Sequence, residues 1–501
     1  MVNPAIPTVV IAAPASGSGK TTVATGLIGA LTRAGHRVAP FKVGPDFIDP
    51  GYHAVAAGRP GRNLDPNLVG PDRVAPLFAA GCAGADFAVV EGVMGLFDGR
   101  ITDDDLQGSG PGGGGFDGSG PAMGSTAHVA ALIGAPVIVV VDASGHSQTL
   151  AAILHGLRSF DPSVDICGVI LNRVGSPRHE HVLRQACDRV GLPVFAVLGR
   201  ATELVVPSRH LGLIPAVEHG GAARTAVDAM AQLVSETADL AAVVAAGRTR
   251  RAMSGPVWSA AEEVAVARAR TDARAPERPI RVAVAGGAAF TFSYAEHAEL
   301  LAAAGAEVVA FDPLQDGLPG DSDAVIVGGG FPEEHVHTLA ANVGLLEQLR
   351  AHADAGRPIH AECAGLLYLA RDLDGHTMAD VLPVRGHFGP SLTLGYRDAV
   401  ALADSSVFTA GTRITGHEFH RSVVEPIGPA QAAWGWRRVG TSLTDGVIAG
   451  SVHASYLHTH PAGAPESVVR LVDSAVAATA EAELVPGHTS SVRSTHVRTH
   501  P

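Results

Sequence analysis

The feature that most limits the fold of this 501-residue chain is a repeated alternation of short Val/Ile-rich runs with Ala/Leu-rich stretches of helical length. Apolar runs separated by helices are typical of parallel sheets that helices cover on both faces. The alternation occurs twice, so we expect two α/β domains, at residues 7–240 and 280–475. The expected strands are Thr8–Ala13, Arg37–Val43, Asp86–Val90, Pro136–Asp142, Ile166–Leu171, Arg281–Ala285, Glu307–Phe311, Asp323–Val327 and Pro358–Glu362, with short strands near Val447–Val452.

Three segments depart from this pattern. Residues 103–120 are too rich in glycine to pack, so we expect a flexible surface insertion there. Residues 241–279 are rich in Ala, Arg and Glu and are interpreted as a linker that can hold a helix at Ser259–Arg270. Residues 486–501 are rich in Ser, Thr, His and Arg, and we expect a disordered tail.

The composition argues against several classes of function. A net charge of −13 disfavours nucleic acid or an anionic membrane as the main partner. No apolar run reaches the roughly 18 residues that a membrane span needs, and no signal peptide opens the chain. Four cysteines in a chain of this length fit neither a disulfide framework nor a zinc motif. We therefore expect a cytoplasmic protein with reduced thiols.

The first apolar run leads directly into a glycine loop, Gly17–Thr22, and then into a helical stretch. Backbone N–H groups of such a loop can wrap phosphates, lysine can reach the β- and γ-phosphates, and threonine can ligate Mg²⁺. Only two of the 36 Lys and Arg residues are lysines, Lys20 and Lys42, and both belong to this N-terminal segment. Pro14 replaces the first glycine of the usual pattern, as in one branch of P-loop proteins. An ordinary Gly/Ser turn is the alternative, but the strand and helix around the loop favour a nucleotide site.

Carboxylates follow two more of the expected strands. Asp46 and Asp49 come after Lys42, while Glu91 and Asp98 come after the run that ends at Val90. The carboxyl ends of parallel strands meet at one edge of a sheet, where ligands bind. Mg²⁺ uses one or two protein carboxylates together with phosphate oxygens, so some of these four acids can position the substrate instead. A solvated loop acid is the other interpretation, and it fits Glu91 least.

A second site is predicted around Cys363. This cysteine follows an expected strand and precedes a helical stretch, which is the sharp elbow that presents a nucleophile. The glycine triplet that follows Val327 can supply backbone N–H donors for an oxyanion, and His458 can act as the base. A lone cysteine is usually a small buried apolar residue, and Cys82, Cys167 and Cys187 are interpreted so.

Together these motifs resemble the cobyrinic acid a,c-diamide synthase family of corrinoid biosynthesis, which includes the hydrogenobyrinic acid a,c-diamide synthases. The resemblance runs from about residue 7 to about residue 475, in the order of the family. The N-terminal half is also similar to dethiobiotin synthetase, and the C-terminal half to a class I glutamine amidotransferase. The matching motifs lie at Ala13–Thr21, Lys42–Pro50, Glu91–Gly99, Gly124–Ala127, Leu171–Val174, His210–Ala216, Gly328–Glu333, Ala361–Cys363 and Ser455–His460.

The resemblance implies an α/β enzyme, with a P-loop domain and an amidotransferase domain, that uses ATP, Mg²⁺ and glutamine to amidate the a and c acetate groups of a corrinoid. ATP would phosphorylate each carboxylate, and ammonia from a cysteine-dependent glutaminase would displace the phosphate. It implies Cys363 as nucleophile and His458 as its activating base, and a homodimer is one conceivable assembly. The other implied residues are Gly17, Ser18, Gly19, Lys20, Thr21, Thr22, Lys42 and Asn172 for ATP; Thr21, Asp46, Asp49 and Glu91 for Mg²⁺; Gly329, Gly330 and Ala364 for the oxyanion; and Asp98, Ser125 and Thr126 for the substrate.

Two departures from the family pattern concern the glutaminase site. Ala364 stands where relatives often have glycine, which still permits the elbow. His460 stands where many class I enzymes have the carboxylate of the triad, so the third member is not visible and a Cys–His dyad is an alternative.

Other functions are weighed against this one. A cobyric acid synthase has the same two-part layout and amidates other side chains. A ParA/MinD-type switch could share the N-terminal half, but Pro14–Ser18 lacks the early lysine that such switches usually carry. A catalytically inactive scaffold would not need Lys20 and Cys363. The arginine-rich character favours metal-free hydrogenobyrinic acid over cobyrinic acid only by association with aerobic pathways.

Overall fold

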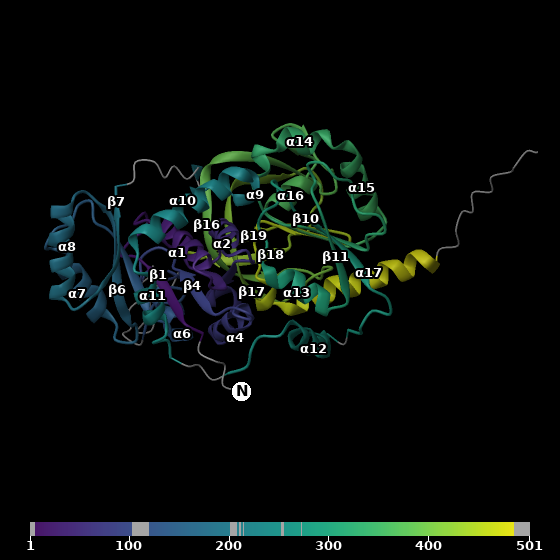
Figure 1. Ribbon diagram of the computed structural model, residues 1–501. Coiled ribbons are helices and arrows are strands. Elements are labelled where there is room, and N and C mark those ends of the chain that lie inside the picture. The colour runs from purple at the N-terminus through teal and green to yellow at the C-terminus, as the bar shows by residue number, and fades with distance from the viewer. Residues whose placement is uncertain are drawn as a thin grey trace, which may run out of the picture.

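The computed structural model describes residues 6–102, 120–200, 208–209, 212–213, 215–251, 255–271 and 273–484. Apart from Gly120, the insertion expected at 103–120 lies outside the described residues, and so does the tail expected at 486–501. The chain forms two α/β lobes that lie side by side (Figure 1). The predicted fold class is therefore confirmed. Within the described residues, no helix is both long and apolar enough to cross a membrane.

The N-terminal lobe is built on a sheet with strand order β3-β2-β4-β1-β5-β6-β7, in which every pairing is parallel. The five predicted strands are present. The sheet also contains β3, whose three residues form no apolar run that would predict it, and β7. The strands are β1 Thr8–Ala12, β2 Val38–Val43, β3 Arg62–Leu64, β4 Phe87–Glu91, β5 Val137–Asp142, β6 Ile166–Val174 and β7 Val194–Gly199.

Helices cover both faces of this sheet, as the apolar strands require. Successive side chains of β1 point to opposite faces, so Val9 packs with α1 and α10 while Val10 packs with α4 and α6. The helices of this lobe are α1 Lys20–Arg33, α2 Asp49–Ala57, α3 Pro66–Val69, α4 Pro71–Gly81, α6 Thr126–Ile133, α7 Leu150–Phe160, α8 Pro177–Arg189, α9 Ala216–His219 and α10 Gly221–Thr237, with a short β8 Ser208–Arg209 and β9 Gly212–Leu213 pair.

The C-terminal lobe has a second sheet, of order β11-β10-β12-β13-β21-β20, which is parallel except for the β20–β21 pair. The four runs that predict strands in this lobe form β10 to β13, and the short strands expected near Val447–Val452 are also present. Its elements are β10 Ile280–Ala285, α13 Ala295–Ala303, β11 Ala306–Phe311, β12 Ala324–Val327, α14 Val336–Ala341, α15 Val343–Asp354, β13 Ile359–Glu362, α16 Ala364–Leu369, β20 Val447–Ala449, β21 Val452–Ser455 and α17 Pro465–Leu484, with 3-10 turns at Pro332–Glu334 and Pro461–Gly463.

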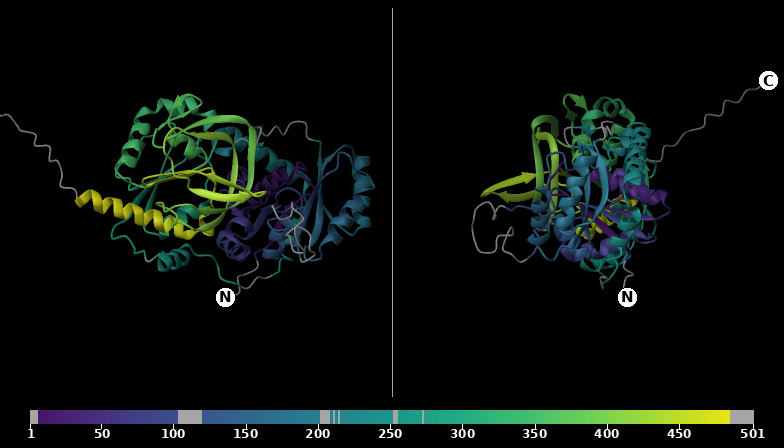
Figure 2. Two further views of the ribbon diagram at one scale, coloured as in Figure 1. Left: turned by 180° about the vertical axis from the view of Figure 1, so that it is seen from behind. Right: turned by 60° about the vertical axis from the view of Figure 1, so that its left-hand side comes forward.

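A third sheet was not predicted. Its centre is the long antiparallel hairpin of β16 and β17, whose pairing shifts register between Phe388 and Thr393. Many of the hairpin side chains are polar and half-exposed, so no strong apolar pattern marks them. In the left view of Figure 2 the hairpin lies over the boundary of the two lobes, and its strand β17 contacts α3 of the first lobe. The strands are β14 Asp372–Leu373, β15 His376–Thr377, β16 Val384–Ala401, β17 Arg413–Pro426, β18 Trp434–Arg438 and β19 Thr441–Asp445.

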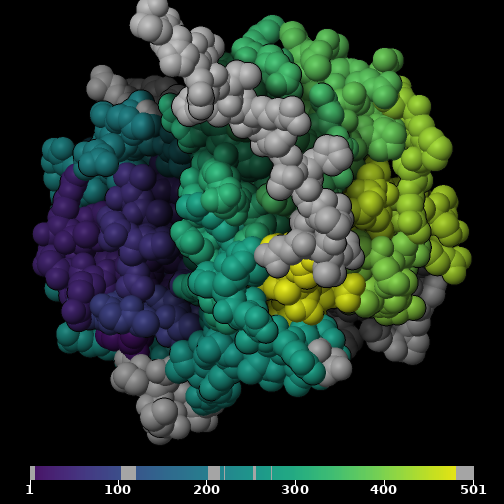
Figure 3. Space-filling view, turned by 90° about the vertical axis from the view of Figure 1, so that its right-hand side faces the viewer, coloured from purple at the N-terminus to yellow at the C-terminus, as the bar shows by residue number. Residues whose placement is uncertain are grey.

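The stretch expected to be a linker, residues 241–279, carries two packed helices. Helix α11, Leu240–Gly247, lies against β1, and Val243 is fully buried there. Helix α12, Ala260–Thr271, packs against α13 and α17. Figure 3 shows this teal part of the chain between the purple N-terminal segment and yellow α17. Most of the stretch is therefore packed structure that joins the two lobes.

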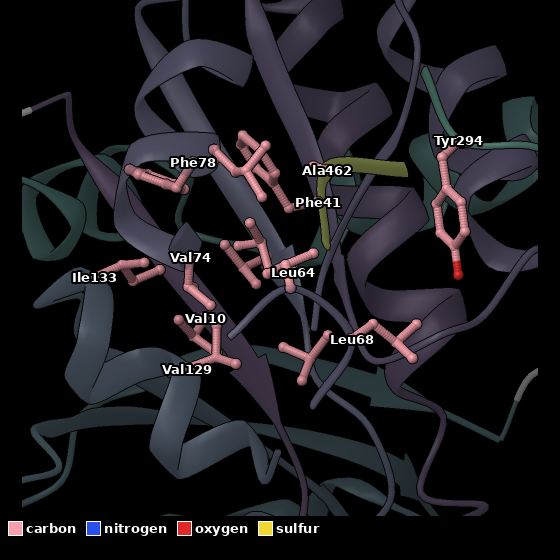
Figure 4. Close-up of a cluster of buried hydrophobic side chains, with 14 of the residues drawn as sticks. Val10, Phe41, Leu64, Leu68, Val74, Phe78, Val129, Ile133, Tyr294 and Ala462 are labelled. Atoms are coloured by element: carbon pink, nitrogen blue, oxygen red, sulfur yellow. The ribbon is translucent and has the colours of Figure 1, made fainter. Parts of the chain in front are cut away.

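The lobes share one hydrophobic core. Leu64 and Leu68 of the first lobe belong to the same buried cluster as Tyr294 and Ala462 of the second (Figure 4). Arg62 Nη1 donates to Glu296 Oε1 at 2.7 Å across the same boundary. This continuous packing holds the carboxyl ends of β2 and β4 facing the second lobe.

Candidate active site

The glycine loop between β1 and α1 is shaped by its contact with the end of β6. Gly19 has φ +91°, and a Cβ atom there would lie 2.3 Å from Asn172 Nδ2, so only glycine fits. The Asn172 amide donates to the Ser18 carbonyl at 2.9 Å, and its Oδ1 accepts from Arg173 N. Asn172, which the resemblance implies for ATP binding, therefore braces the glycine loop.

Lys20 begins α1 and is buried, with its ammonium donating to the Met94 carbonyl of the loop that follows β4. Burial and the neighbouring Lys42 lower the pKa of Lys20 from its ordinary value. An anion beside the ammonium would offset both effects, because it would favour the charged form. Thr21 follows Lys20 in the first turn of α1, and its hydroxyl points at the carboxylates of Asp49 and Glu91.

Thr21, Lys42, Asp49 and Glu91 form one cluster, in which Lys42, Asp49 and Glu91 are buried and Thr21 is half-buried. Lys42 Nζ donates to Asp49 Oδ2 at 2.6 Å and to Glu91 Oε1 at 3.0 Å. Thr21 Oγ1 donates to Glu91 Oε1 at 2.6 Å and lies 3.3 Å from Asp49 Oδ2. Burial alone would lower the pKa of Lys42, but the two carboxylates outweigh it and raise the pKa above its ordinary value. The ends of β2 and β4 thus bring these predicted residues together.

His53 is a member of this cluster that the sequence reasoning missed. Its Nε2 lies 2.7 Å from Glu91 Oε2, and the ring is fully buried. Burial would raise the pKa of Glu91, yet Lys42 and His53 hold it below its ordinary range. The available signal was spacing, because a residue four positions after Asp49 on a helix faces the same side.

The other predicted acids and hydroxyls form hydrogen bonds with backbone groups. Asp46 Oδ1 accepts from Ile48 N at 2.8 Å and from Asp49 N at 3.0 Å, and its Oδ2 lies 4.0 Å from Lys42 Nζ. Asp98 Oδ2 accepts from Gly95 N at 2.8 Å, so it holds the loop after β4. Ser125 caps α6, and Thr126 Oγ1 exchanges hydrogen bonds with the backbone of Val93. In these positions they shape the site walls.

The residues present fit a magnesium ion. Thr21, Asp49 and Glu91 converge their oxygens, and burial together with Asp46 and Glu91 raises the pKa of Asp49, as expected where negative charge exceeds positive charge. In the described part of the chain, no group of three His, Cys, Asp or Glu side chains is arranged to hold a metal by itself. Mg²⁺ takes few protein ligands and completes its shell with phosphate and water oxygens.

In the second lobe, Cys363 lies at a sharp turn between β13 and α16. Its φ of +50° and ψ of −101° are rare for a residue with a side chain, and strain of this kind is common at nucleophiles. Cys363 N donates to the Ser455 carbonyl at 2.7 Å, which ties the turn to β21. The other three cysteines are also free, and burial raises the pKa of Cys82 to about 12.

His458 is buried beside Cys363, and its Nδ1 lies 3.7 Å from Glu362 Oε2. Burial alone would lower the pKa of His458, but Cys363 and Glu362 outweigh it and raise the pKa to about 10. Burial would raise the pKa of Glu362, while His458, His360 and Thr459 lower it to about 2. The site therefore brings the Glu362 carboxylate, the His458 ring and the Cys363 sulfur into one chain of contacts.

Glu362 contacts His458 at Nδ1, the side of the ring where a third member of a Cys–His–carboxylate site would lie. His460 does something else: its Nδ1 accepts from Ala462 N at 3.2 Å at the start of a 3-10 turn, and its Nε2 is 4.0 Å from Glu296 Oε2. A carboxylate directly before the nucleophile was the signal in the sequence. The sequence alone does not link this carboxylate to His458, because only the fold brings the two side chains together.

The glycine triplet lies next to the same histidine. A Cβ atom on Gly329 would be 2.5 Å from His458 Cε1 and 2.8 Å from Phe292 Cδ2, so a side chain is excluded. Gly330 instead presses against the Ala289 carbonyl, where a Cβ atom would lie 2.0 Å away. Ala364 is fully buried at the first position of α16. Of the three oxyanion candidates, Gly329 and Ala364 lie beside His458 and Cys363 respectively.

Comparison with known proteins bears on both lobes. Residues 9–214 match the CobQ/CobB/MinD/ParA nucleotide binding domain, and residues 281–465 match the CobB/CobQ-like glutamine amidotransferase domain. The hydrogenobyrinate a,c-diamide synthase of Mycobacterium bovis is 55% identical over 93% of this chain and 97% of its own length. The chain belongs to the a,c-diamide synthase family. The predicted resemblance is thereby confirmed, and this family member is a glutamine-dependent ligase.

Other relatives carry the same kind of name. The hydrogenobyrinate a,c-diamide synthase of Streptomyces coelicolor is 51% identical over 94% of this chain and 97% of its own length. The cobyrinate a,c-diamide synthase of Gloeobacter violaceus is 39% identical over 90% of this chain and 93% of its own length. These matches span both lobes, whereas a ParA/MinD-type switch would resemble only the N-terminal half of this chain.

Proposed function

We propose that this enzyme amidates the a and c acetate groups of hydrogenobyrinic acid, with ATP and glutamine as co-substrates. The observation that carries the proposal is a phosphate loop with an acidic cluster in one lobe and a Cys–His–Glu site in the other, packed on one core. The more similar relatives are named for the metal-free substrate and a more distant one for cobyrinate. ATP and glutamine are metabolites of the cytoplasm, where we place the reaction.

The first lobe activates the carboxylate. A carboxylate does not accept ammonia unaided, so its oxygen attacks the γ-phosphorus of ATP, the bond to the β-phosphate oxygen breaks, and an acyl phosphate and ADP form. The backbone of Gly17–Gly19 wraps the phosphates, and Lys20 neutralises their charge. Thr21, Asp49 and Glu91 would hold Mg²⁺, which would supply further neutralisation of charge on the phosphate oxygens.

The second lobe releases ammonia. Cys363 Sγ attacks the side-chain amide carbon of glutamine, and His458 returns the thiol proton to the leaving ammonia. Glu362 keeps the His458 ring oriented and stabilises its positive charge, while the N–H groups of Gly329 and Ala364 face the developing oxyanion. Water then cleaves the thioester to glutamate, and ammonia displaces phosphate from the acyl phosphate to give the amide.

The test is mass spectrometry of hydrogenobyrinic acid and of cobyrinic acid after incubation with ATP and glutamine, using the wild type and Cys363→Ala. We expect the wild type to add two amides to hydrogenobyrinic acid, and Cys363→Ala to do so only when ammonia is supplied. Amidation of cobyrinic acid alone would reverse the substrate assignment. ATP hydrolysis with no mass gain on either acid would refute the corrinoid proposal, and amidation beyond two groups would favour a cobyric acid synthase.

A further inference from the structure

One aromatic side chain of the ATP lobe reaches the catalytic histidine of the other lobe. Phe47 lies between Asp46 and Asp49 in the loop that joins β2 to α2. Its ring centroid lies 5.2 Å from that of His458. The same ring stacks on Phe292 at 4.9 Å with planes 10° apart, and it contacts Tyr294 at 4.9 Å. A single residue therefore touches the glutaminase base from the loop that carries the acidic residues.

The loop behind Phe47 is held firmly. Asn63 Nδ2 donates to the carbonyls of Gly44 and Asp46, at 2.8 and 2.7 Å. Asp46 closes the turn from the other side by accepting from Ile48 N and Asp49 N. The position of the Phe47 ring thus follows the position of Asp49, whose carboxylate is bonded to Lys42 in the acidic cluster.

On the far side, Phe292 extends the contact to the glycine triplet. Phe292 N donates to the Gly329 carbonyl at 3.1 Å, and its ring lies 6.0 Å from that of His458. Phe331 packs edge-on against Phe292 at 5.3 Å. These rings form an apolar layer that runs from the β2–α2 loop of the first lobe to His458 and the glycine triplet of the second. Such a layer keeps out water, which would otherwise protonate ammonia and hydrolyse an acyl phosphate.

We propose that Phe47 is the positioning residue that couples the two centres, because its ring holds His458 in register with the phosphate-site loop and shields ammonia from solvent during transfer. This inference rests on the proposed function and deepens it. Truncating the ring leaves Cys363, Lys20 and the acidic cluster in place but separates glutamine hydrolysis from amide formation. The signature is glutamate produced without a matching amide.

The experiment uses the full chain and measures glutamate and amide in the same reaction, with ATP and hydrogenobyrinic acid. For Phe47→Ala we expect the ratio of glutamate to amide to rise at least about threefold. The rate of amidation from added ammonia should fall by a smaller factor than the rate of amidation from glutamine. Phe47→Leu fills the space without the stacked ring and should show a smaller rise. Phe47→Tyr, which keeps the ring, should restore the ratio. Phe160→Ala, at an exposed phenylalanine on α7, is the matched control and should leave the ratio unchanged.

Two results would overturn the inference. One is an unchanged ratio in both Phe47→Ala and Phe47→Leu when each variant remains folded by circular dichroism. The other is a proportional loss of ammonia-dependent and glutamine-dependent amidation, which would confine Phe47 to the ATP site. Failure of the wild type to amidate with either nitrogen source would instead refute the proposed function, so the two failures are distinguishable.

Discussion

Glu362 and Cys363 are neighbours in the sequence, yet they act on different sides of one histidine. The strained turn at Cys363 sends its thiol to His458, while Glu362 ends β13 and reaches Nδ1 of the same ring. Thr459 also donates to Glu362 Oε1, through both its backbone and its hydroxyl. The carboxylate is thereby fixed before glutamine binds, which favours orientation of the base.

Glu362→Gln should lower glutaminase kcat/KM by about tenfold or more and move its basic limb to lower pH. The pKa of His458 is raised to about 10, so the ring in the folded enzyme stays protonated well below pH 10 and loses its proton as pH rises through about 10. Removing the Glu362 charge lowers that pKa. The measurement is a pH profile of glutamate release. His460→Gln is the control, and a shift there with none in Glu362→Gln would mean that His460, and not Glu362, sets the pKa of His458.

Lys20→Arg should reduce ammonia-dependent amidation by about 100-fold or more while leaving glutaminase activity within about twofold. A planar guanidinium does not replace a compact ammonium that is buried beneath a glycine loop. Steady-state rates of ADP and glutamate formation measure the two activities separately. Arg33→Lys, on the exposed end of the same helix, is the comparison, and equal losses in both variants would argue against a phosphate contact at Lys20.

At the scale of elements, the β16–β17 hairpin is attached to the first lobe through the cap of α3. Asp65 Oδ1 accepts from Asn67 N and Leu68 N, and its Oδ2 accepts from Tyr396 Oη at 2.9 Å. Burial raises the pKa of Asp65 to about 6, although Tyr396 and the backbone donors oppose this. A buried carboxylate thus connects the β3–α3 unit, which no apolar run predicts, to a sheet that was also not predicted.

Tyr396→Phe should lower the free energy of unfolding by about 1.5 to 3 kcal/mol at pH 7.5, because it leaves a buried carboxylate without one donor. Because the folded pKa of Asp65 is raised, the stability gained by protonating it is present below about pH 4 and is lost as pH rises through about 6. The cost of Tyr396→Phe should therefore shrink towards pH 4.5. Urea unfolding at both pH values measures it.

Tyr368→Phe is the matched control for that experiment. Among the described residues, the buried hydroxyl of Tyr368 has no hydrogen-bond partner, so its removal should cost nothing or stabilise the fold. A loss as large in Tyr368→Phe as in Tyr396→Phe would mean that ring packing, and not the bond to Asp65, accounts for the effect.

At the scale of the whole molecule, the two lobes form one packed unit in which charge and apolar contacts cross the boundary together. Arg62 of β3 contacts both Glu296 and Glu299 of α13. Glu296 is 1% exposed, whereas Glu299 is 39% exposed, so only the first contact is a buried pair. This difference decides which of the two should matter for stability.

Arg62→Ala should lower the free energy of unfolding by about 3 kcal/mol, because it leaves the Glu296 carboxylate buried without its cation. Replacing both partners, Arg62→Met with Glu296→Gln, should recover much of that loss. Arg33→Ala, which breaks an exposed pair with Asp228, should cost less than about 1 kcal/mol. Guanidinium unfolding of the four proteins checks this, and equal costs for Arg62→Ala and Arg33→Ala would contradict it.

Much of the architecture could be predicted from local patterns. The apolar runs predicted β1, β2, β4, β5 and β6 because strands buried on both faces must be apolar throughout. The glycine loop and the elbow at Cys363 were also visible, since each needs particular residues at consecutive positions. The β16–β17 hairpin was not visible, because half-exposed strands with many polar residues leave no periodic signal.

The sequence by itself determined the fold class, the family and the residues from which two active centres can be built, because these depend on short motifs. Only the tertiary structure decided how the centres are completed. His53 joins Glu91, Glu362 joins His458, and Phe47 of one lobe meets the base of the other. Each of these contacts joins residues from different elements or lobes. Their meeting depends on sheet order and on the packing of the two lobes, which no local pattern encodes.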